Sequence, residues 1–213
     1  MNERMRIAIT KGRLLDKSVK LFEQAGFDCG PVKNPGRCLV HSLPNYPLDA
    51  VLAKAPDVIT YVENGVCDLG IVGRDTILEK GGTFYEVLDL GFGKCRFALA
   101  VKEGTDFYGT YKTRRIASKY PEVTRAFFEK KGMDVDIIKI EGSVELAPIL
   151  GLTDAIVDIV ETGATLKANG LVPIETVADV SARLIVNTAS MKLYKNQISD
   201  FIARCEAELE GNP

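Results

Sequence analysis

The stretch D-A-I-V-D-I-V-E-T-G-A-T-L, from Asp154 to Leu166, decides the fold of this chain more than any other. The apolar run from Ala155 to Val160 is typical of a strand that is covered on both faces. Asp158 interrupts this run, and a carboxylate inside a buried strand needs a partner or a ligand. Small, hydroxyl-bearing residues follow, and the residues from Leu166 can continue as a short helix. The stretch predicts a buried strand, a tight turn and a helix.

The turn between this strand and this helix has the composition of an anion-binding site. Hydroxyl groups, a flexible glycine and backbone N–H groups at a helix start all favour a phosphate. Carboxylates such as Asp158 and Glu161 suit the hydroxyl groups of a sugar, so the segment indicates a ribose phosphate. An ordinary turn in which Thr162 caps the helix is the alternative, and a T-G-x-T turn alone does not separate the two.

Composition narrows the class of partner. The 213 residues allow one large domain or two small ones, and a hydrophobic content of 46% is enough for a sizeable core. The net charge of −2, from 27 basic and 29 acidic residues, argues against a nucleic acid held by bulk electrostatics. The basic run Lys112 to Arg115 is interpreted as a solvated loop. We therefore expect no nucleic-acid partner.

The cysteines and the histidine indicate neither disulfides nor a metal site. Five widely spaced cysteines without a C-x-x-C pair are typical of free thiols in a reducing cytosol. The only histidine, His41, lies in a strand-like run and is interpreted as structural. The N-terminus has no signal-peptide pattern, and no stretch approaches the ~20 apolar residues of a membrane span. A soluble cytoplasmic protein is expected.

Strand and helix patterns alternate along almost the whole chain, which predicts an α/β fold with a mostly parallel sheet. The predicted strands are 6–10, 37–43, 48–53, 68–72, 85–90, 96–101, 115–118, 135–140, 171–177 and 183–187, besides the opening strand. The predicted helices are 12–25, 56–64, 76–80, 121–131, 144–150, 166–169 and 190–210. In the helix 121–131, Val123, Ala126 and Phe127 are expected to face inward.

The glycines near Phe92 mark the expected crossover between two lobes. We predict that residues 1–92 and 183–213 form a discontinuous lobe I and that residues 93–182 form lobe II, which carries the opening segment. Two α/β lobes with a ligand cleft between them, at the carboxyl ends of the strands, are expected.

Other turns at strand ends also suit phosphates. Lys11-Gly12-Arg13 directly follows the first strand, where two cations can hold phosphate oxygens; a basic solvated turn is the alternative. Arg37 and Lys54 flank strands and read singly as surface charges. The segment from Asp68 to Asp75 repeats the pattern of a buried strand and a polar turn.

Two glycines and a serine are candidate substrate-contact residues in the turns at these strand ends. Gly70 and Gly73 lie in the Asp68 to Asp75 segment, where Gly70 allows close approach to the backbone or serves only in packing. Glu141 to Glu145 is a third such turn, in which Ser143 is a candidate helix cap. We expect phosphate-suited turns from both lobes.

The chain resembles ATP phosphoribosyltransferase, the enzyme that opens histidine biosynthesis. Five blocks in the same order carry this resemblance, which covers nearly the whole chain. They are I-T-K-G-R-L from Ile9, T-Y-V-E-x-G-x-x-D-L-G-I-V-G-x-D from Thr60, S-K-Y-P-x-x-T-R from Ser118, G-S-V-E-L-A-P from Gly142, and the opening segment.

The resemblance implies a fold and a reaction. The fold would have two lobes like those of type II periplasmic binding proteins. The reaction would transfer phosphoribosyl from phosphoribosyl pyrophosphate (PRPP) to N1 of ATP, which gives N1-(5-phosphoribosyl)-ATP and pyrophosphate. Its transition state resembles an oxocarbenium ion, so the protein must mainly hold two polyanions in line and stabilise the departing charge. Mg²⁺ would arrive with PRPP and ATP, with no site made of protein ligands alone.

The resemblance also assigns residues. The catalytic residues, facing pyrophosphate or the phosphates of ATP, would be Lys11, Arg13, Arg37 and Lys54. Lys54 departs from the family, which usually has arginine there, and a lysine lacks the bidentate fork. The PRPP-binding residues would be Asp154 and Asp158 on the ribose hydroxyls, Thr162, Gly163, Ala164 and Thr165 around the 5-phosphate, and Glu161 beside them. Further substrate contacts are expected from Gly70, Gly73, Asp75, Ser143 and Glu145.

The length of the chain implies a partner. Long forms of the family carry an additional C-terminal regulatory domain, whereas this chain resembles the short form, which works with a histidyl-tRNA synthetase-like regulatory subunit. The implied assembly is a hetero-octamer of four catalytic and four regulatory chains.

Two alternatives remain open on the residues alone. A two-lobed binding or sensing domain without catalysis would share the fold, although an uncharged ligand would require neither the Lys11 and Arg13 pair nor the T-G-A-T turn. A phosphoribosyltransferase for another base is the second alternative, because the residues that hold adenine are not identifiable from the sequence.

Overall fold

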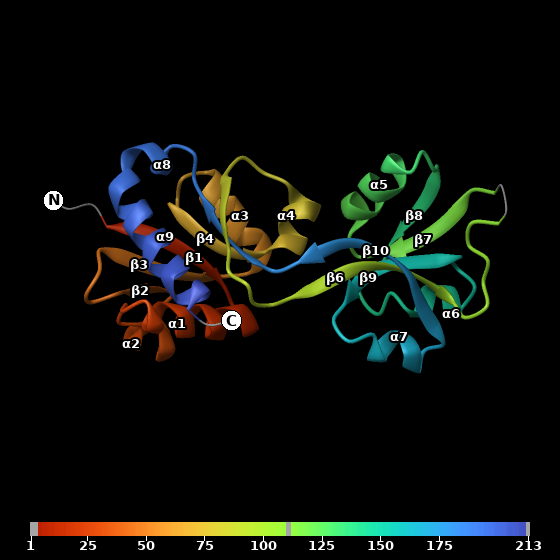
Figure 1. The fold of residues 1–213 in the computed structure, drawn as a ribbon, viewed down its shortest axis with the longest axis horizontal. Helices are drawn as coiled ribbons and strands as arrows, with labels where there is room; N and C mark the ends of the chain where they lie inside the picture. Colours follow the sequence, from red (N-terminus) through yellow and green to blue (C-terminus); the bar gives the residue numbers. More distant parts are fainter. Residues whose placement is uncertain (1–3, 110–111, 212–213) are drawn as a thin grey trace. The chain divides into compact units, whose positions relative to one another are not determined.

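The computed structural model describes residues 4–109 and 112–211, and the chain divides into two compact units (Figure 1). Unit 1 contains the described residues up to Gly93 and those from Ser181 onward, and unit 2 those from Lys94 to Val180. Unit 2 is therefore continuous in sequence, whereas unit 1 is built from two separate segments.

Unit 1 contains a six-stranded mixed sheet with strand order β2-β3-β1-β4-β11-β5. Its strands are β1 Met5–Thr10, β2 Val40–Ser42, β3 Leu48–Ala53, β4 Leu69–Gly73, β5 Tyr85–Asp89 and β11 Ala182–Val186. Its helices are α1 Arg13–Gln24, α2 Gly30–Lys33, α3 Ala55–Glu63, α4 Arg74–Lys80, α8 Ser190–Leu193 and α9 Lys195–Glu210.

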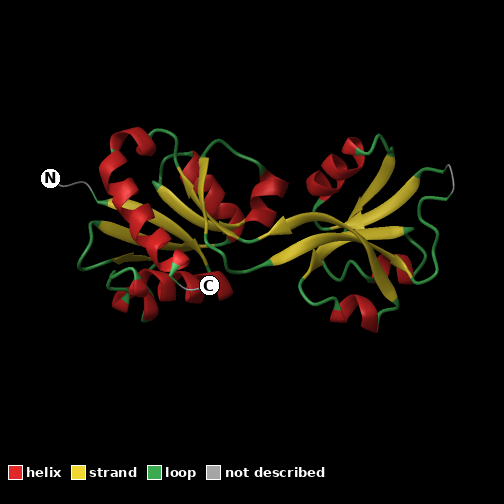
Figure 2. Ribbon diagram, in the orientation of Figure 1, coloured by secondary structure: helices red, strands yellow, loops and turns green. Residues whose placement is uncertain are grey.

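The alternation of side chains along β1 gives the sheet of unit 1 two buried faces. Ile7 and Ile9 belong to the core that α1 and α9 cover, in which Phe22 and Phe201 meet edge to face with ring centroids 5.3 Å apart. Ala8 belongs to the opposite core, which α3 covers. Helices thus lie on both faces of the sheet, as Figure 2 shows.

Unit 2 contains a five-stranded mixed sheet with strand order β10-β6-β9-β7-β8. Its strands are β6 Cys95–Lys102, β7 Arg114–Ser118, β8 Val135–Lys139, β9 Ala155–Val160 and β10 Leu171–Val180. Its helices are α5 Pro121–Lys130, α6 Leu146–Ile149 and α7 Ala164–Ala168.

The two faces of this second sheet differ in the size of their side chains. Phe97 and Phe128 belong to the core on one face, to which α5 contributes. The opposite core is built largely from small residues such as Ala98 and Ala117, and Leu166 of α7 belongs to it.

The α/β fold is confirmed, but the expectation of a mostly parallel sheet is wrong. In the described residues, four strand pairs are parallel and five are antiparallel. Besides the β2–β3 hairpin, β6 pairs antiparallel with β9 and β10, and β11 pairs antiparallel with β4 and β5, so strands from distant parts of the sequence enter the sheets in the opposite direction. A hydrophobic pattern carries no information on strand direction.

Three predicted details also differ. The predicted helix 190–210 is two helices, because Tyr194, with φ −114° and ψ 29°, leaves the helical conformation and packs against the core of unit 1. In α5 the buried residues are Val123, Thr124 and Phe128, and Ala126 is exposed, so the inward face lies about one residue further along than predicted. The predicted strand 37–43 is shorter, because Arg37 lies in the turn before β2.

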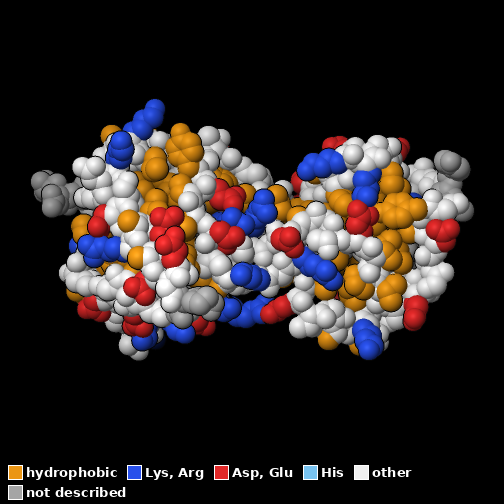
Figure 3. All heavy atoms as spheres, in the orientation of Figure 1, with side chains coloured by type: hydrophobic (Ala, Val, Ile, Leu, Met, Phe, Trp, Pro, Cys, Tyr) orange, Lys and Arg blue, Asp and Glu red, His pale blue; other side chains and the backbone are white. Residues whose placement is uncertain are grey.

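The cysteines are free thiols, as the sequence predicts. Within the described residues, we find no helix whose length and apolar character would let it cross a lipid bilayer. Acidic and basic side chains are interspersed on the face of each unit that Figure 3 shows.

Candidate functional site

The carboxyl ends of three parallel strands meet at one end of the sheet in unit 2. β7 lies between β8 and β9 and is parallel to both, with Ser118 paired to Lys139 on one side and to Val157 on the other. The segments that follow these strands therefore share this end: Lys119 after β7, the turn 141–145 after β8, and the turn 161–165 after β9. Carboxyl ends of parallel strands are where α/β sheets bind ligands.

Within the turn after β9, the uncharged residues 162–165 form a hydrogen-bonding loop. Gly163 has φ 79° and ψ 2°, a left-handed conformation that glycine adopts at little cost, and it directly precedes α7. Thr162 and Thr165 are exposed, and the Oγ1 of Thr162 accepts a long hydrogen bond of 3.4 Å from the N–H of Ala164. The first N–H groups of a helix have no partner within it. The loop thus presents hydroxyl and N–H groups together.

Leu166 fixes this loop to the body of unit 2. Its side chain is 4% exposed and belongs to the core that the alanines of β6 and β7 line. The loop therefore sits on a short helix anchored in the core, although five residues are too few for α7 to contribute much dipole. Glu161 is exposed beside Thr162.

Asp158 is a half-buried carboxylate on the small-residue face of the same strand. Its neighbour on β6 is Ala98, and Ala117 of β7 belongs to the same core. The Oδ1 of Asp158 accepts a hydrogen bond of 2.8 Å from the N–H of Ile159. Because its neighbours are small, a ligand with hydroxyl donors can reach this carboxylate.

The electrostatic surroundings of Asp158 come from all three strand ends. Burial raises the pKa of Asp158, the hydrogen bond from the Ile159 N–H opposes this shift, Glu145 adds to it, and Lys119 opposes it. Glu145 and Lys119 therefore act on this carboxylate from the segments after β8 and β7. Ser143 is exposed in the same turn as Glu145 but does not cap α6 as predicted, since the cap position is Glu145 itself.

Asp154 lies apart from this group of residues, so the structure does not bring it together with Asp158, the other predicted ribose ligand. β9 lies between Asp154 and the loop, which at about 3.3 Å per residue separates them by roughly 20 Å. Its carboxylate accepts hydrogen bonds from Lys112 Nζ at 2.8 Å and from the N–H of Arg115 at 2.9 Å. Asp154 therefore stabilises the amino end of the sheet.

Unit 1 brings together the four predicted basic residues at the carboxyl end of its own sheet. Thr10 and Ala53 are paired at the ends of β1 and β3, so Lys11 and Lys54, the next residues, are neighbours. Arg13 follows after Gly12, whose φ of 86° and ψ of −147° require glycine.

Arg37 reaches the same end of the sheet from the opposite direction. β2 is antiparallel to β3, with Val40 paired to Val51, and the N–H of Leu52 donates to the oxygen of Leu39 at 3.3 Å. The turn before β2, which contains Arg37, therefore lies where β3 ends. Cations from three separate segments at one place favour an anionic ligand.

Gly70 packs inside unit 1, as the alternative interpretation of this glycine expects, and its substrate contact stays a prediction. It lies inside β4 and is fully surrounded: an added Cβ would come within 2.8 Å of Val62 Cγ2 and 2.9 Å of Val58 Cγ1. Gly73 is different, because it ends β4 and caps α4, and the carboxylate of Asp75 folds back over it. Gly73 and Asp75 thus lie at the carboxyl end of the sheet.

Lys119 is the residue that sequence reasoning missed. It lies within the S-K-Y-P block, but its neighbours could not be foreseen without knowing that β7 is the central strand of three. The available signal was its position directly after a short strand, which is the same signal that identified Lys11.

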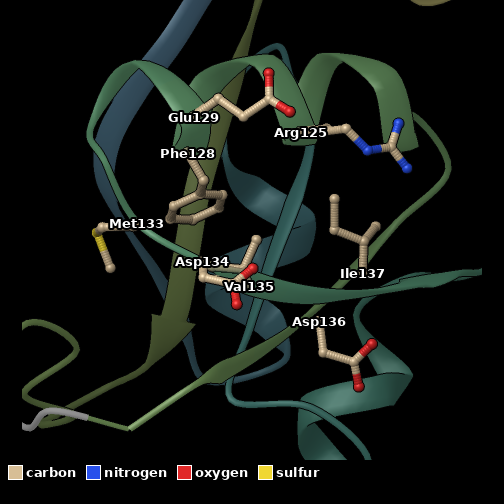
Figure 4. A pocket seen from close by; sticks show the side chains of 8 residues that line it. All are labelled: Arg125, Phe128, Glu129, Met133, Asp134, Val135, Asp136 and Ile137. Carbon is tan, nitrogen blue, oxygen red and sulfur yellow. The ribbon is translucent and has the colours of Figure 1, made fainter.

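One pocket of unit 2 lies apart from these residues. A pocket of about 370 Å³ in unit 2 lies between α5 and the amino end of β8 (Figure 4). Its lining includes Phe128 and Met133, and it lies away from the carboxyl ends of the strands. Across residues 4–109 and 112–211, no three His, Cys, Asp or Glu side chains are grouped so that they could hold a metal ion.

Comparison with known proteins gives a consistent match. The profile of the HisG family, described as ATP phosphoribosyltransferase, matches residues 54–207. An ATP phosphoribosyltransferase of Clostridium kluyveri is 57% identical over 206 residues, which cover 97% of this chain and 94% of that protein. One of Clostridium acetobutylicum is 56% identical over 210 residues, covering 98% and 97%.

Two solved structures are similar to this chain in fold. The ATP phosphoribosyl transferase (HisG:HisZ) complex from Thermotoga maritima matches with a TM-score of 0.82 and 31% identity, over 98% of this chain and 100% of that one. The periplasmic aliphatic sulphonate binding protein SsuA from Escherichia coli matches with a TM-score of 0.57 and 13% identity, over 98% of this chain and 73% of that one. The second match shows a shared fold alone, that of a periplasmic binding protein.

Proposed function

The chain belongs to the ATP phosphoribosyltransferase family, and from this premise we propose how its residues divide the reaction. The enzyme transfers the phosphoribosyl group of PRPP to N1 of ATP, which yields N1-(5-phosphoribosyl)-ATP and pyrophosphate in the first step of histidine biosynthesis.

Unit 2 binds the ribose 5-phosphate half of PRPP in this proposal. The loop from Thr162 to Thr165 holds the 5-phosphate through hydroxyl and N–H groups, and Asp158 accepts hydrogen bonds from the ribose hydroxyls. The observation that supports this most is the meeting of an exposed hydroxyl-bearing loop with a half-buried carboxylate at one end of β9. Glu161, Ser143 and Glu145 surround these two and are secondary candidates.

The basic residues of unit 1 bind phosphates in this proposal. Lys11, Arg13, Arg37 and Lys54 act as catalytic residues on the departing pyrophosphate or on the phosphates of ATP. An oxocarbenium-like transition state releases negative charge on the leaving group, and preorganised cations stabilise that charge. Lys54 supplies a point charge in place of a guanidinium fork. Gly73 and Asp75, which follow β4 at the same place, are secondary candidates.

Magnesium enters as part of the substrates. Mg²⁺ bound to the pyrophosphate of PRPP would supply charge neutralisation on the leaving group. The protein side chains then orient the phosphates, exclude water and complement the remaining charge.

We also propose a second subunit and a cytoplasmic location. The matched Thermotoga maritima structure is a HisG:HisZ complex, which supports a regulatory partner of that kind for this chain. The hetero-octamer of four catalytic and four regulatory chains stays a prediction, as does the cytoplasm, where ATP and PRPP are available.

The activity is tested by incubating the purified chain, with its regulatory partner, in ATP, PRPP and magnesium. We expect phosphoribosyl-ATP and pyrophosphate in equal amounts, identified by mass spectrometry. Absence of product at saturating substrates would leave a two-lobed binding protein, the alternative that the fold alone allows.

The phosphate loop is tested by the double substitution Thr162→Val and Thr165→Val. Loss of two hydroxyl donors should weaken PRPP binding by about 10-fold or more, at ~1 kcal/mol for each hydrogen bond. The matched control is Thr113→Val, an exposed threonine before β7, at the opposite end of the sheet. Titration calorimetry measures the affinity for PRPP, and circular dichroism measures the fold. Equal PRPP affinity in the wild type and both variants would contradict phosphate binding and favour a turn that serves only as a helix cap.

A further inference from the structure

The carboxyl end of the unit 2 sheet carries more negative than positive charge. Asp158, Glu161, Glu141 and Glu145 all lie in or directly after β8 and β9. Lys139, at the end of β8, is engaged by Glu141, with Nζ and Oε1 2.8 Å apart. A phosphate group placed here by a neutral loop would be repelled unless another cation took part.

Lys119 is the cation in the right place. Ala117 pairs with Ile156 and Ser118 with Val157, so the next residue along β7, Lys119, is level with Asp158 on β9. Alternate residues of a strand share a face, and Ala117 and Ile156 both belong to the small-residue core. Lys119 and Asp158 therefore point to the same side of the sheet.

Lys119 is also available to bind a ligand. It is exposed, and its ammonium group makes no hydrogen bond or ion pair with any of the described residues. Its charge opposes the raised pKa of Asp158 and, after Lys139, contributes to the lowered pKa of Glu141, so the ammonium acts on two carboxylates without a bond to either.

We propose that Lys119 is a further catalytic residue, whose ammonium binds a phosphoryl oxygen of PRPP while the neighbouring Asp158 receives the ribose hydroxyls. This inference rests on the proposed function of unit 2. The phosphoryl oxygen can belong to the 5-phosphate or to the pyrophosphate at C1, because Lys119 is level with the ribose ligand. A lysine suits either group as a flexible point charge.

The test compares Lys119→Gln with the full-length wild type by titration calorimetry. Two probes are titrated separately, ribose 5-phosphate and magnesium pyrophosphate. We expect one of them to bind about 10- to 100-fold more weakly to the variant, the loss typical of a charge-assisted hydrogen bond. The probe that weakens identifies the phosphoryl group that Lys119 contacts. Lys119→Arg should retain most of the affinity, because it keeps the charge.

The matched control is Lys130→Gln, which makes the same change in charge at an exposed position of α5. Circular dichroism and thermal melting establish that all variants are folded. With the regulatory partner present, Lys119→Gln should raise KM for PRPP, or lower kcat, without raising KM for ATP.

Unchanged affinity for both probes in Lys119→Gln, or an equal loss in Lys130→Gln, would overturn the proposal. The proposed function is judged separately, by phosphoribosyl-ATP formation in the wild type. An active wild type whose Lys119→Gln variant binds both probes normally would contradict the inference about Lys119 alone.

Discussion

At the scale of single residues, Asp158 is a side chain whose proposed role in binding comes at a cost to the stability of the fold. Its carboxylate lies among alanines on a strand that is otherwise apolar, and burial raises its pKa. A carboxylate whose folded pKa lies above its unfolded value costs stability when it ionises. The chain tolerates this cost at the position where a sugar hydroxyl would bind.

Asp158→Asn should therefore stabilise the protein while it weakens PRPP binding. Wild-type stability should fall as pH rises from about 3.9, the unfolded pKa of Asp, through the raised folded pKa. The neutral amide of the variant has no such loss. The free energy of unfolding of the variant should therefore exceed that of the wild type by ~0.5–2 kcal/mol at pH 7.5, and this difference should vanish below pH ~4. Thermal melts at both pH values measure the first effect, and PRPP titration the second, for which about 10- to 100-fold is expected. A variant that is less stable at pH 7.5 would contradict this view of Asp158.

Gly70→Ala tests the packing role of Gly70. The added methyl group would overlap Val62 and Val58, and overpacking of this kind costs about 1–3 kcal/mol of unfolding free energy. Gly142→Ala is the matched control, since nothing lies within 4 Å of its added Cβ. Urea unfolding of both variants measures the difference. If both were equally stable, the close packing of α3 on β4 would be in doubt.

At the scale of elements, β9 has two ends with different roles. Its carboxyl end leads into the candidate phosphate loop, whereas Asp154, before its amino end, bonds to Lys112 and to the N–H of Arg115. Burial opposes ionisation of Asp154, but the Arg115 N–H and Lys112 outweigh it, so its pKa is lowered.

Asp154→Ala should destabilise the protein without changing PRPP affinity. Loss of these hydrogen bonds to a carboxylate should cost about 1–3 kcal/mol of unfolding free energy at neutral pH. Because the folded pKa is depressed, this contribution is present above pH ~4 and is lost as pH falls through the folded pKa. Urea unfolding at pH 7 and pH 3, with the exposed Asp136→Ala as control, measures it. Weaker PRPP binding in the folded Asp154→Ala protein would restore Asp154 to the site.

The sequence predicts most helices and strands, but it does not predict which strands pair or in which direction. The reason is physical. The hydrophobic pattern of β9 and the small residues after it are local, so the strand, turn and helix can be read directly from Asp154 to Leu166. Whether β6 is parallel to β9 depends on residues far apart in the chain, as does the close packing around Gly70. Lys119 escaped notice for the same reason, because its role depends on which strands flank β7.

At the scale of the whole molecule, strand order makes the two units unequal. β11 is paired on one side to β4 and on the other to β5, so the sheet of unit 1 is completed only by residues after unit 2. Unit 2 has both of its buried cores within one continuous segment.

Fragments should reflect this difference. Residues 94–180 alone should fold, with a cooperative thermal transition and dispersed amide resonances, because every strand of their sheet is present. Residues 1–93 alone should not, because β5 lacks β11, the strand to which it is paired. Addition of a peptide of residues 181–213 should restore structure to the second fragment. A cooperative transition in residues 1–93 without that peptide would contradict the expected dependence on β11.

The position of β11 also has a consequence for biosynthesis. A ribosome releases the chain from the N-terminus, so all strands of unit 2 emerge before the strand that joins β4 to β5. Domains generally fold as units during synthesis, and the first ninety or so residues must therefore wait on the nascent chain while the later segment folds. Unit 2 is therefore synthesised later than the first segment of unit 1 but completes its fold earlier. The residues up to Gly93 are the part that chaperones would need to protect until translation ends.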